Sequence, residues 1–103
     1  MTQELWEILI PASEHDEPFS KDYHRIWDAK IRAITGGLTI HTVAKGQWVN
    51  KEDGWQLYEE QMIPVRVSCT REQLEEILKI TKEHYKQTQI MAVKISSEVI
   101  FYE

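Results

Sequence analysis

Apolar side chains alternate with other side chains in the first segment of the chain, which predicts a β-strand over residues 5–10. One face of this strand is entirely apolar and consists of Trp6, Ile8 and Ile10. The other face has Glu7 as its only polar residue, so the strand is expected to be covered on both faces. Pro11 ends the strand, and the polar, turn-rich residues 12–19 are expected to form a loop.

Two later segments have apolar residues at helical spacing. The first spans residues 21–35, with Ser20 as its expected N-cap and a Gly-Gly pair as its stop. The second begins at a capping box formed by Thr70 and Gln73 and continues to Tyr85. Both segments are therefore predicted to be amphipathic helices that bury one side.

Three further runs alternate in the manner of strands and cover residues 38–45, 62–69 and 89–95. Pro64 cannot donate to a sheet ladder, so it marks an edge position or a bulge. Residues 46–61 are expected to form the long tip of a hairpin between the first two runs. A short terminal strand is predicted over residues 99–102, where an exposed edge can pair with another subunit.

The predicted order is strand, helix, strand, strand, helix, strand, followed by the short extra strand. This is the α+β, ferredoxin-like βαββαβ pattern, in which two helices pack on one face of a four-stranded antiparallel sheet. We expect a single domain over residues 1–103. The apolar first strand requires a cover for the other sheet face. Small trimeric proteins of the PII signalling type bury that face by bringing three sheets together, and the chain resembles that class; a homotrimer is expected, with a dimer as the alternative.

Composition narrows the class of protein. The chain of 103 residues is 42% hydrophobic and 28% charged, which is typical of a soluble globular domain. Its net charge of −5 argues against non-specific binding to nucleic acid. No apolar run approaches the ~20 residues that span a bilayer, and no signal peptide is evident, so no membrane partner is expected. Cys69 is the only cysteine, which excludes an internal disulfide and favours a cytoplasmic location. It is expected to be a buried hydrophobe.

Candidate chemistry is sparse. None of the common enzymatic motifs for phosphate loops, zinc proteases or serine hydrolases is present. The four histidines fall on four different predicted elements, so neither a metal site nor a cofactor is expected. The adjacent residues His15, Asp16 and Glu17 are interpreted as a solvated acidic loop rather than as metal ligands. His24 lies beside the apolar face of its helix, where a structural histidine is favoured over a catalytic one.

The hairpin tip is where we expect a functional site. It carries Trp48, Trp55 and Tyr58, whose large apolar surfaces need a cover. The alternative is that these side chains fold back on the sheet as core. Four tryptophans in so short a chain also indicate an interface between subunits.

Two family resemblances follow from these residues. From Gly36 onward, the order GGLT, GQW and an acidic residue before a Val-rich strand resembles an uncharacterised bacterial domain family. The whole chain resembles, more loosely, the bacteriophage S-adenosylmethionine lyases, which are PII-like trimers. The segments that carry the second resemblance are the strand and Ser-bearing loop LIPAS at residues 9–13, Tyr-His-Arg at 23–25, Gly46 with Trp48, an acidic residue at 59 or 60, and VRVSC at 65–69.

The second resemblance implies a lyase that converts S-adenosylmethionine to methylthioadenosine and homoserine lactone at subunit interfaces. The substrate carboxylate attacks its own γ-carbon, and the sulfonium departs as a thioether. A protein that promotes this reaction needs to fold the substrate and exclude water. It needs no nucleophile and no acid–base pair, in keeping with the lack of such motifs.

The resemblance also implies the site residues. Glu60 and Tyr58 are the expected catalytic pair, with Glu60 orienting the ammonium or favouring the sulfonium. Glu60 is preferred to the neighbouring acid because it is expected to face the same side as Tyr58. Trp48 stands where the family has a tip tyrosine, and Tyr58 is expected to replace that group. The residues expected to bind substrate, through stacking, cation–π attraction or polar contact, are Ala12, Ser13, Trp48, Glu59 and Met62.

Two alternatives stay open. The chain can be a non-catalytic PII-like module that binds a small nucleotide or a protein partner through the same tip, or a purely structural phage protein. Turnover of S-adenosylmethionine distinguishes the lyase from both.

Overall fold

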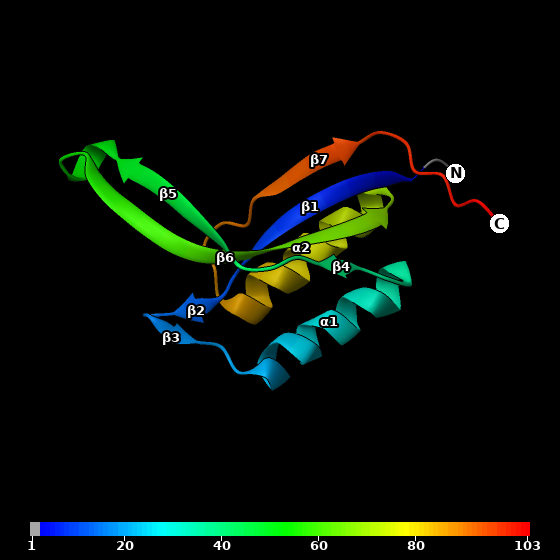
Figure 1. Cartoon of the computed structure of the whole chain (residues 1–103), viewed down its shortest axis with the longest axis horizontal. Coiled ribbons are helices and arrows are strands. Elements are labelled where there is room, and N and C mark those ends of the chain that lie inside the picture. The colour runs from blue at the N-terminus through cyan, green and yellow to red at the C-terminus, as the bar shows by residue number, and fades with distance from the viewer. Residues whose placement is uncertain (1–2) are drawn as a thin grey trace.

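Two helices cover one face of an antiparallel sheet in the computed structural model, which describes residues 3–103 (Figure 1). The helices are α1, Lys21–Thr35, and α2, Arg71–Tyr85. The sheet has the strand order β4-β6-β1-β7, and β5 pairs with the outer part of β6. Its strands are β1 Glu4–Pro11, β4 Thr39–Ile40, β5 Ala44–Asn50, β6 Gln56–Cys69 and β7 Ala92–Ser96. The predicted α+β, ferredoxin-like arrangement is confirmed.

Both helices begin where the sequence predicts. The Ser20 hydroxyl accepts the backbone N–H of Tyr23 at 3.1 Å, and Gly36 closes α1 in the left-handed conformation with a φ of 83°. At the start of α2, the side chains of Thr70 and Gln73 each accept the other's backbone N–H. These local bonds satisfy groups that the first helical turn leaves without partners.

The core lies between the helices and one face of the sheet. It is made of Trp6, Ile8, Ile10, Trp27, Ile31, Val65, Val67, Cys69, Leu74, Ile77 and Tyr85. The apolar face predicted for the first strand is therefore the face that packs on the helices. Burial raises the pKa of the Cys69 thiol to about 11, so this cysteine is an inert part of the core.

The predicted hairpin tip is wrong in its boundaries. Strands β5 and β6 remain paired from Ala44 opposite Met62 to Asn50 opposite Gln56, and they form a two-stranded ribbon that we call the arm, residues 44–62. Only a 3₁₀ turn, η1 Lys51–Asp53, and the next two residues connect the strands. The chain reverses this sharply because Gly54 and Trp55 both have a positive φ. Figure 1 shows the arm extending beyond the helices.

The single strand predicted for residues 38–45 is divided into β4 and β5. His41 donates its backbone N–H to the Pro64 carbonyl at 2.9 Å, but Pro64 has no N–H with which to return the bond. The ladder therefore breaks at residues 41–43, and Pro64 lies at a locally unpaired edge of β6. Its pairing with Leu9 of β1 continues in register, so the bulge given as the alternative is not formed. The proline is tolerated in this inner strand because the missing donor faces the break.

The segment of residues 12–19 is more ordered than the predicted loop. It contains a small hairpin of β2, Ser13–Glu14, and β3, Glu17–Pro18. Its turn places His15 and Asp16 at φ values of 49° and 65°. Two consecutive residues with positive φ match the twist of a tight two-residue hairpin, which the sequence conceals because neither is glycine.

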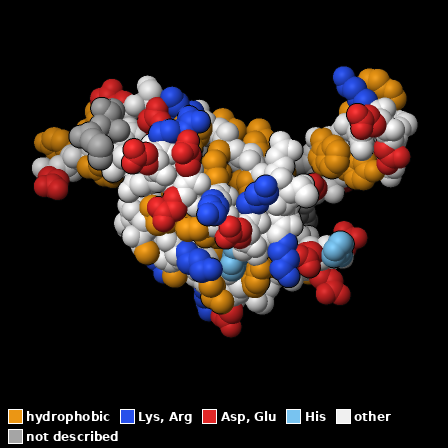
Figure 2. All heavy atoms as spheres, turned by 180° about the vertical axis from the view of Figure 1, so that it is seen from behind, with side chains coloured by type: hydrophobic (Ala, Val, Ile, Leu, Met, Phe, Trp, Pro, Cys, Tyr) orange, Lys and Arg blue, Asp and Glu red, His pale blue; other side chains and the backbone are white. Residues whose placement is uncertain are grey.

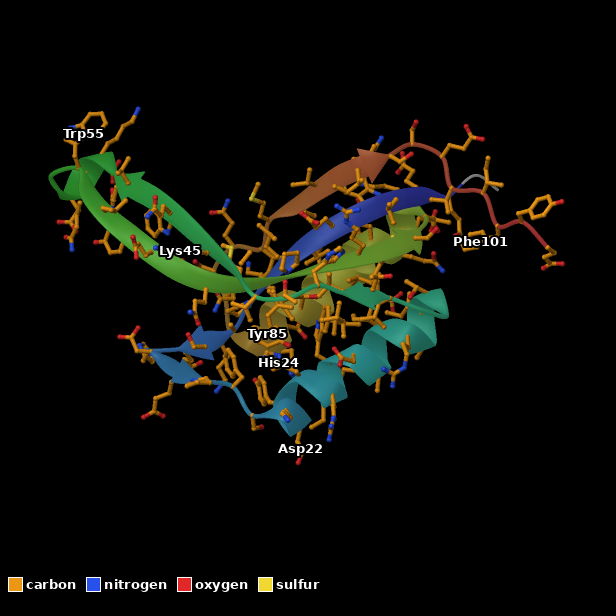
Figure 3. The ribbon with its side chains drawn as sticks, in the orientation of Figure 1. Asp22, His24, Lys45, Trp55, Tyr85 and Phe101 are labelled. Carbon is orange, nitrogen blue, oxygen red and sulfur yellow. The ribbon has the colours of Figure 1, made fainter. Side chains whose placement is uncertain are left out.

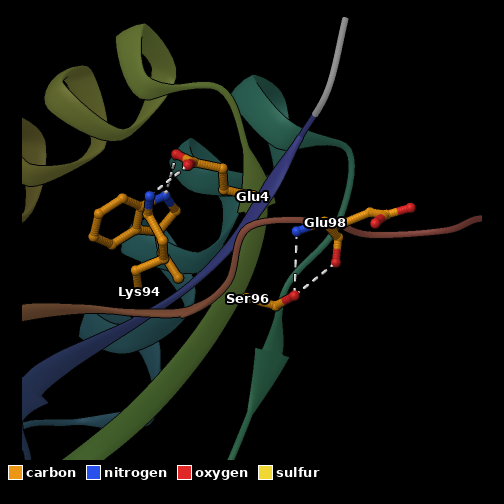
Figure 4. Close-up of polar contacts among 5 residues, drawn as sticks. Glu4, Lys94, Ser96 and Glu98 are labelled. Carbon is orange, nitrogen blue, oxygen red and sulfur yellow. Dashed lines mark hydrogen bonds and ion pairs between the residues drawn. The ribbon is translucent and has the colours of Figure 1, made fainter.

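The end of the chain also differs from the prediction. Strand β7 is joined to β1 by an ion pair of 2.7 Å between Lys94 Nζ and Glu4 Oε2 (Figure 4). Within residues 3–103, the strand predicted over residues 99–102 does not form. Ile100, Phe101 and Tyr102 are 77%, 71% and 95% exposed, so a strand at this position requires a partner from outside the chain.

The sheet face away from the helices, which we call the open face, is not strongly polar. Leu5 and Leu9 of β1 are half-buried there. Val93 is paired with Glu7 on the same face and is 37% exposed. Glu7 forms an ion pair of 3.2 Å with Arg66 of β6. A single chain thus leaves an apolar surface with one ion pair exposed.

Candidate functional site

An open cleft of about 970 Å³ lies between the arm, the β2–β3 hairpin and the end of α2. Pro11 and Pro18 form part of its wall, and Lys86 and Gln87 close it at the helix end. Lys86 is held in the left-handed conformation as the C-cap of α2. The charged and titratable residues that line the cleft are Glu14, His15, Asp16, Lys45, Tyr58, Glu59, Glu60 and Lys86.

The cleft has an excess of negative charge. Four carboxylates and two lysine ammonium groups line it, and one lysine is already engaged by a carboxylate, with 3.7 Å between Lys45 Nζ and Glu59 Oε2. A concave site with this balance attracts cations and disfavours anions. In residues 3–103, no group of three or more histidine, cysteine or acidic side chains is placed to hold a metal ion.

Four of the predicted site residues meet at this cleft. Ser13, Tyr58, Glu59 and Glu60 all line it. Ala12 does not line the cleft, but its backbone N–H donates to the carbonyl of the lining residue Gln61 at 3.1 Å.

Two predicted residues lie on the arm outside the cleft wall. Met62 packs against Gly46, where a Cβ would lie 3.3 Å from the Met62 sulfur. Trp48 does not line the cleft but contacts Tyr58 and Glu60, which do.

Trp48 joins the two residues that were expected to be catalytic. Its ring stacks on that of Tyr58 with centroids 4.6 Å apart and planes at 15°. Its indole N–H donates to Glu60 Oε1 at 3.3 Å. Glu60 therefore shares a face of the arm with Tyr58, whereas Glu59 belongs to the opposite face, where it accepts from Gln47 at 2.7 Å.

The aromatic side chains of the arm do not fold back as core. Trp48 is 47% exposed and Trp55 is 63% exposed. Figure 2 shows hydrophobic side chains gathered on the end of the arm, away from the body of the protein. The alternative that these groups complete the core of a single chain is therefore wrong.

Two of the three histidines outside the cleft, His24 and His84, have structural contacts. His24 Nδ1 lies 2.7 Å from the Tyr85 hydroxyl, and His84 Nε2 lies 2.8 Å from the Tyr23 carbonyl oxygen. Figure 3 places His24 and Tyr85 beside each other between the two helices. Burial lowers the pKa of His24, which keeps its imidazole neutral near pH 7.

Sequence reasoning missed the contribution of Asp53, Lys45, Lys86 and Gln87. Asp53 accepts the Tyr58 hydroxyl at 2.7 Å, and the other three line the cleft. Asp53 lies only five positions before Tyr58. A tight turn between the two strands, had the sequence been interpreted in that way, would have indicated that the two side chains can meet. Lys86 and Gln87 carry no such signal, because the cleft brings the end of a helix near the arm through tertiary packing alone.

Comparison with known proteins identifies the fold. No protein-family model matches the chain, and no curated protein sequence does. Among solved structures, the divalent cation tolerance protein CutA1 of Thermus thermophilus is 14% identical with a TM-score of 0.67, covering 90% of this chain and 82% of that one. A phage S-adenosylmethionine lyase in complex with S-methyl-5′-thioadenosine is also 14% identical, with a TM-score of 0.64 and coverage of 95% and 84%.

The chain has the PII-like, ferredoxin-like fold. A third structure of this fold, the periplasmic CutA of Archaeoglobus fulgidus, is 12% identical with a TM-score of 0.68 and covers 96% of this chain and 87% of its own. At these identities the likeness extends to the fold alone, so the resemblance to lyases and the resemblance to an uncharacterised bacterial family stay predictions. Within the described chain, neither helix is long and apolar enough to cross a membrane.

Proposed function

We propose that this protein is an S-adenosylmethionine lyase that acts in the cleft beside the arm. The observation that carries the proposal is the contact of Trp48 with both Tyr58 and Glu60 at the rim of an acidic cleft. Two stacked aromatic rings and a carboxylate suit a ligand with an aromatic base and a positive charge. The phage lyase of the same fold was solved with an adenosine-containing thioether, which supports this ligand class.

The proposed reaction needs positioning rather than a protein nucleophile. The substrate carboxylate forms a bond to its own γ-carbon, the bond from that carbon to sulfur breaks, and its electron pair stays on sulfur. The products are homoserine lactone and methylthioadenosine, and no proton is transferred in the displacement. Glu60 holds the ammonium or the sulfonium, while the rings of Trp48 and Tyr58 hold the adenosyl part in a near-attack shape. Ser13 supplies a further polar contact from the cleft wall, and Glu59, on the opposite face of the arm from Glu60, holds the Lys45 ammonium group at the cleft.

The proposed active form is a homotrimer whose sites lie at subunit interfaces. A single chain leaves the cleft open and Trp48 47% exposed, so water is not excluded from the site. The molecule is 51 Å in its longest dimension, with the arm at one end and the exposed aromatic tail at the other (Figure 3). Surfaces at opposite ends favour head-to-tail contacts, which close into a ring. The open face of the sheet provides further apolar area for that assembly.

A second candidate function is a non-catalytic PII-like module that binds a small molecule. Two structures of the same fold described above are CutA proteins, whose names refer to divalent cation tolerance. The acidic lining of the cleft also suits a cationic ligand that is bound without turnover.

One experiment separates these functions. The purified protein is incubated with S-adenosylmethionine, and methylthioadenosine and homoserine lactone are followed by chromatography. The Glu60→Gln variant removes the carboxylate charge that is proposed to hold the substrate's ammonium or sulfonium, and it is expected to lower turnover by about 100-fold or more. Glu76→Gln, which removes the same charge from an exposed position on α2, is the matched control and should leave turnover unchanged.

The outcomes differ for each candidate. Product from the wild-type chain that depends on Glu60 supports the lyase. Saturable binding of S-adenosylmethionine or a nucleotide with no product overturns the lyase and supports the binding module. If no adenosine compound raises the melting temperature and no product forms, both functions are wrong and a structural role is left.

A further inference from the structure

The turn of the arm holds a carboxylate against the Tyr58 hydroxyl. Tyr58 Oη donates to Asp53 Oδ2 at 2.7 Å. Asp53 is the last residue of η1, which Asn50 caps by accepting the Glu52 N–H at 3.0 Å. Gly54 follows with a φ of 66°, so the backbone fixes the carboxylate on both sides.

The ring of Tyr58 is fixed independently of its hydroxyl. It stacks on Trp48, so the phenol can neither tilt nor slide without losing that contact. With the ring held by Trp48 and the proton held by Asp53, the position of the phenolic oxygen and the direction of its lone pairs are both determined.

We propose that Asp53 is a positioning residue that turns the Tyr58 hydroxyl into an acceptor toward the cleft, so that the site selects a ligand with a cationic or proton-donating group at this point. A phenol has one proton to donate and lone pairs with which to accept. Since the proton is committed to Asp53, a ligand that reaches the phenolic oxygen from the cleft that Tyr58 lines meets only lone pairs. The proposal rests on the function proposed above, because it assumes that ligands bind at this cleft.

The protonation of Tyr58 supports this arrangement. The hydrogen bond to Asp53 raises the pKa of Tyr58, and burial adds to the rise. The phenol therefore keeps its proton near pH 7 and remains a donor to Asp53. The Asp53 charge also polarises the O–H bond and increases the negative charge on the phenolic oxygen.

The selectivity can be measured with a pair of ligands that differ in charge at one atom. S-adenosylmethionine carries a sulfonium, and S-adenosylhomocysteine carries a neutral thioether in its place. An acceptor oxygen attracts the first and gains nothing from the second. Both affinities are measured by calorimetric titration in a Glu60→Gln background, in which S-adenosylmethionine is expected to be consumed about 100-fold more slowly.

The variants isolate the hydrogen bond from the charge. Asp53→Ala removes the acceptor and frees the phenolic proton to face the cleft, whereas Glu52→Ala removes the neighbouring carboxylate of the same turn. We expect Asp53→Ala to reduce the preference for the sulfonium by about tenfold, as the loss of one charge-assisted hydrogen bond would do. Glu52→Ala should leave the preference within about twofold of the parent, because exposed charges contribute little.

A second readout does not depend on any ligand. The ultraviolet titration of tyrosine is recorded for the native sequence and for each variant, and Tyr58→Phe identifies the signal of Tyr58. Asp53→Ala should lower the pKa of Tyr58, and Glu52→Ala should not.

If Asp53→Ala matches Glu52→Ala in both readouts, the assignment of Asp53 is wrong, whatever the turnover assay shows. If the pKa of Tyr58 falls but neither ligand binds any variant, the lyase proposal and the ligand selectivity fail together, and the role of Asp53 in directing the hydroxyl is supported.

Discussion

The indole N–H of Trp27 donates to the Thr81 hydroxyl at 3.0 Å in the interior between α1 and α2. Both residues are 0% exposed. The Thr81 hydroxyl in turn donates to the Ile77 carbonyl at 2.6 Å, so the bond between the helices is part of a short buried chain. A polar link of this kind fixes how the two helices are aligned, because its geometry tolerates little sliding.

Removing the acceptor of this chain should destabilise the fold. Thr81→Val keeps the shape of the side chain but leaves the buried indole N–H without a partner, at a cost of about 1–3 kcal/mol in the free energy of unfolding. Urea unfolding followed by circular dichroism measures the change. Thr81→Ser retains the hydroxyl and is the control for the bond. If Thr81→Val were as stable as the parent, the buried bond would carry no net stability.

The stability of the fold should decrease in mildly acidic solution because of His24. Burial lowers its pKa, the carboxylate of Asp28 opposes that shift, and His84 adds to it. The folded protein therefore binds the imidazole proton more weakly than the unfolded chain does. The contribution of His24 is complete above the unfolded pKa of about 6.5 and is lost as the pH falls below that value. Burial raises the pKa of Asp28, so the effect of Asp28 on stability has the opposite sign to that of His24. It acts at lower pH than the His24 effect, in the range above 3.8, the usual pKa of this group.

The His24 effect can be isolated by difference. Denaturation midpoints are measured between about pH 7.5 and about pH 5.5, a range that spans the usual histidine pKa of about 6.5 and in which unperturbed carboxylates are still ionised. His24→Gln removes the titrating group and should flatten the dependence relative to the parent. Equal slopes for parent and variant would show that His24 is protonated equally well in both states.

The helices and the core could be predicted because their signals are local. Ser20 and Thr70 cap helices through bonds to residues three positions away, and the alternation of residues 5–10 directly gives the face that packs on the helices. The arm was misjudged because its pairing depends on a tight turn at Gly54 and Trp55, and Trp55 is not a residue that normally adopts a positive φ.

Only the part of the candidate site that lies along β6 could be predicted from the sequence. Tyr58 and Glu60 share a face because alternate residues of a strand do, which is a property of sequence spacing. The stacking of Trp48 on Tyr58 depends on the register of β5 against β6, and that register follows from the position of the turn. The walls contributed by the β2–β3 hairpin and the end of α2 arise from contacts between segments that are distant in sequence, and no local pattern reports them.

The open face of the sheet provides a direct test of assembly. Val93 lies on this face opposite Glu7 and is 37% exposed in the single chain. In the proposed trimer it is covered by another copy, so Val93→Glu places a second carboxylate opposite Glu7 in an otherwise apolar contact. We expect the wild-type protein to sediment as three copies of the 12.2 kDa chain and the variant as one. Circular dichroism should be the same for both, since Val93 is outside the core.

The matched control is Ile26→Glu, which makes the same kind of change at a residue of α1 that is 53% exposed. Because α1 lies on the opposite side of the sheet from Val93, this variant should keep the wild-type mass. A wild-type mass of two copies would replace the trimer by a dimer while leaving the open face as the interface. If Val93→Glu sedimented like the wild-type protein, the open face would lie outside the subunit contact, and the water that reaches the cleft would have to be excluded by the ligand and the arm alone.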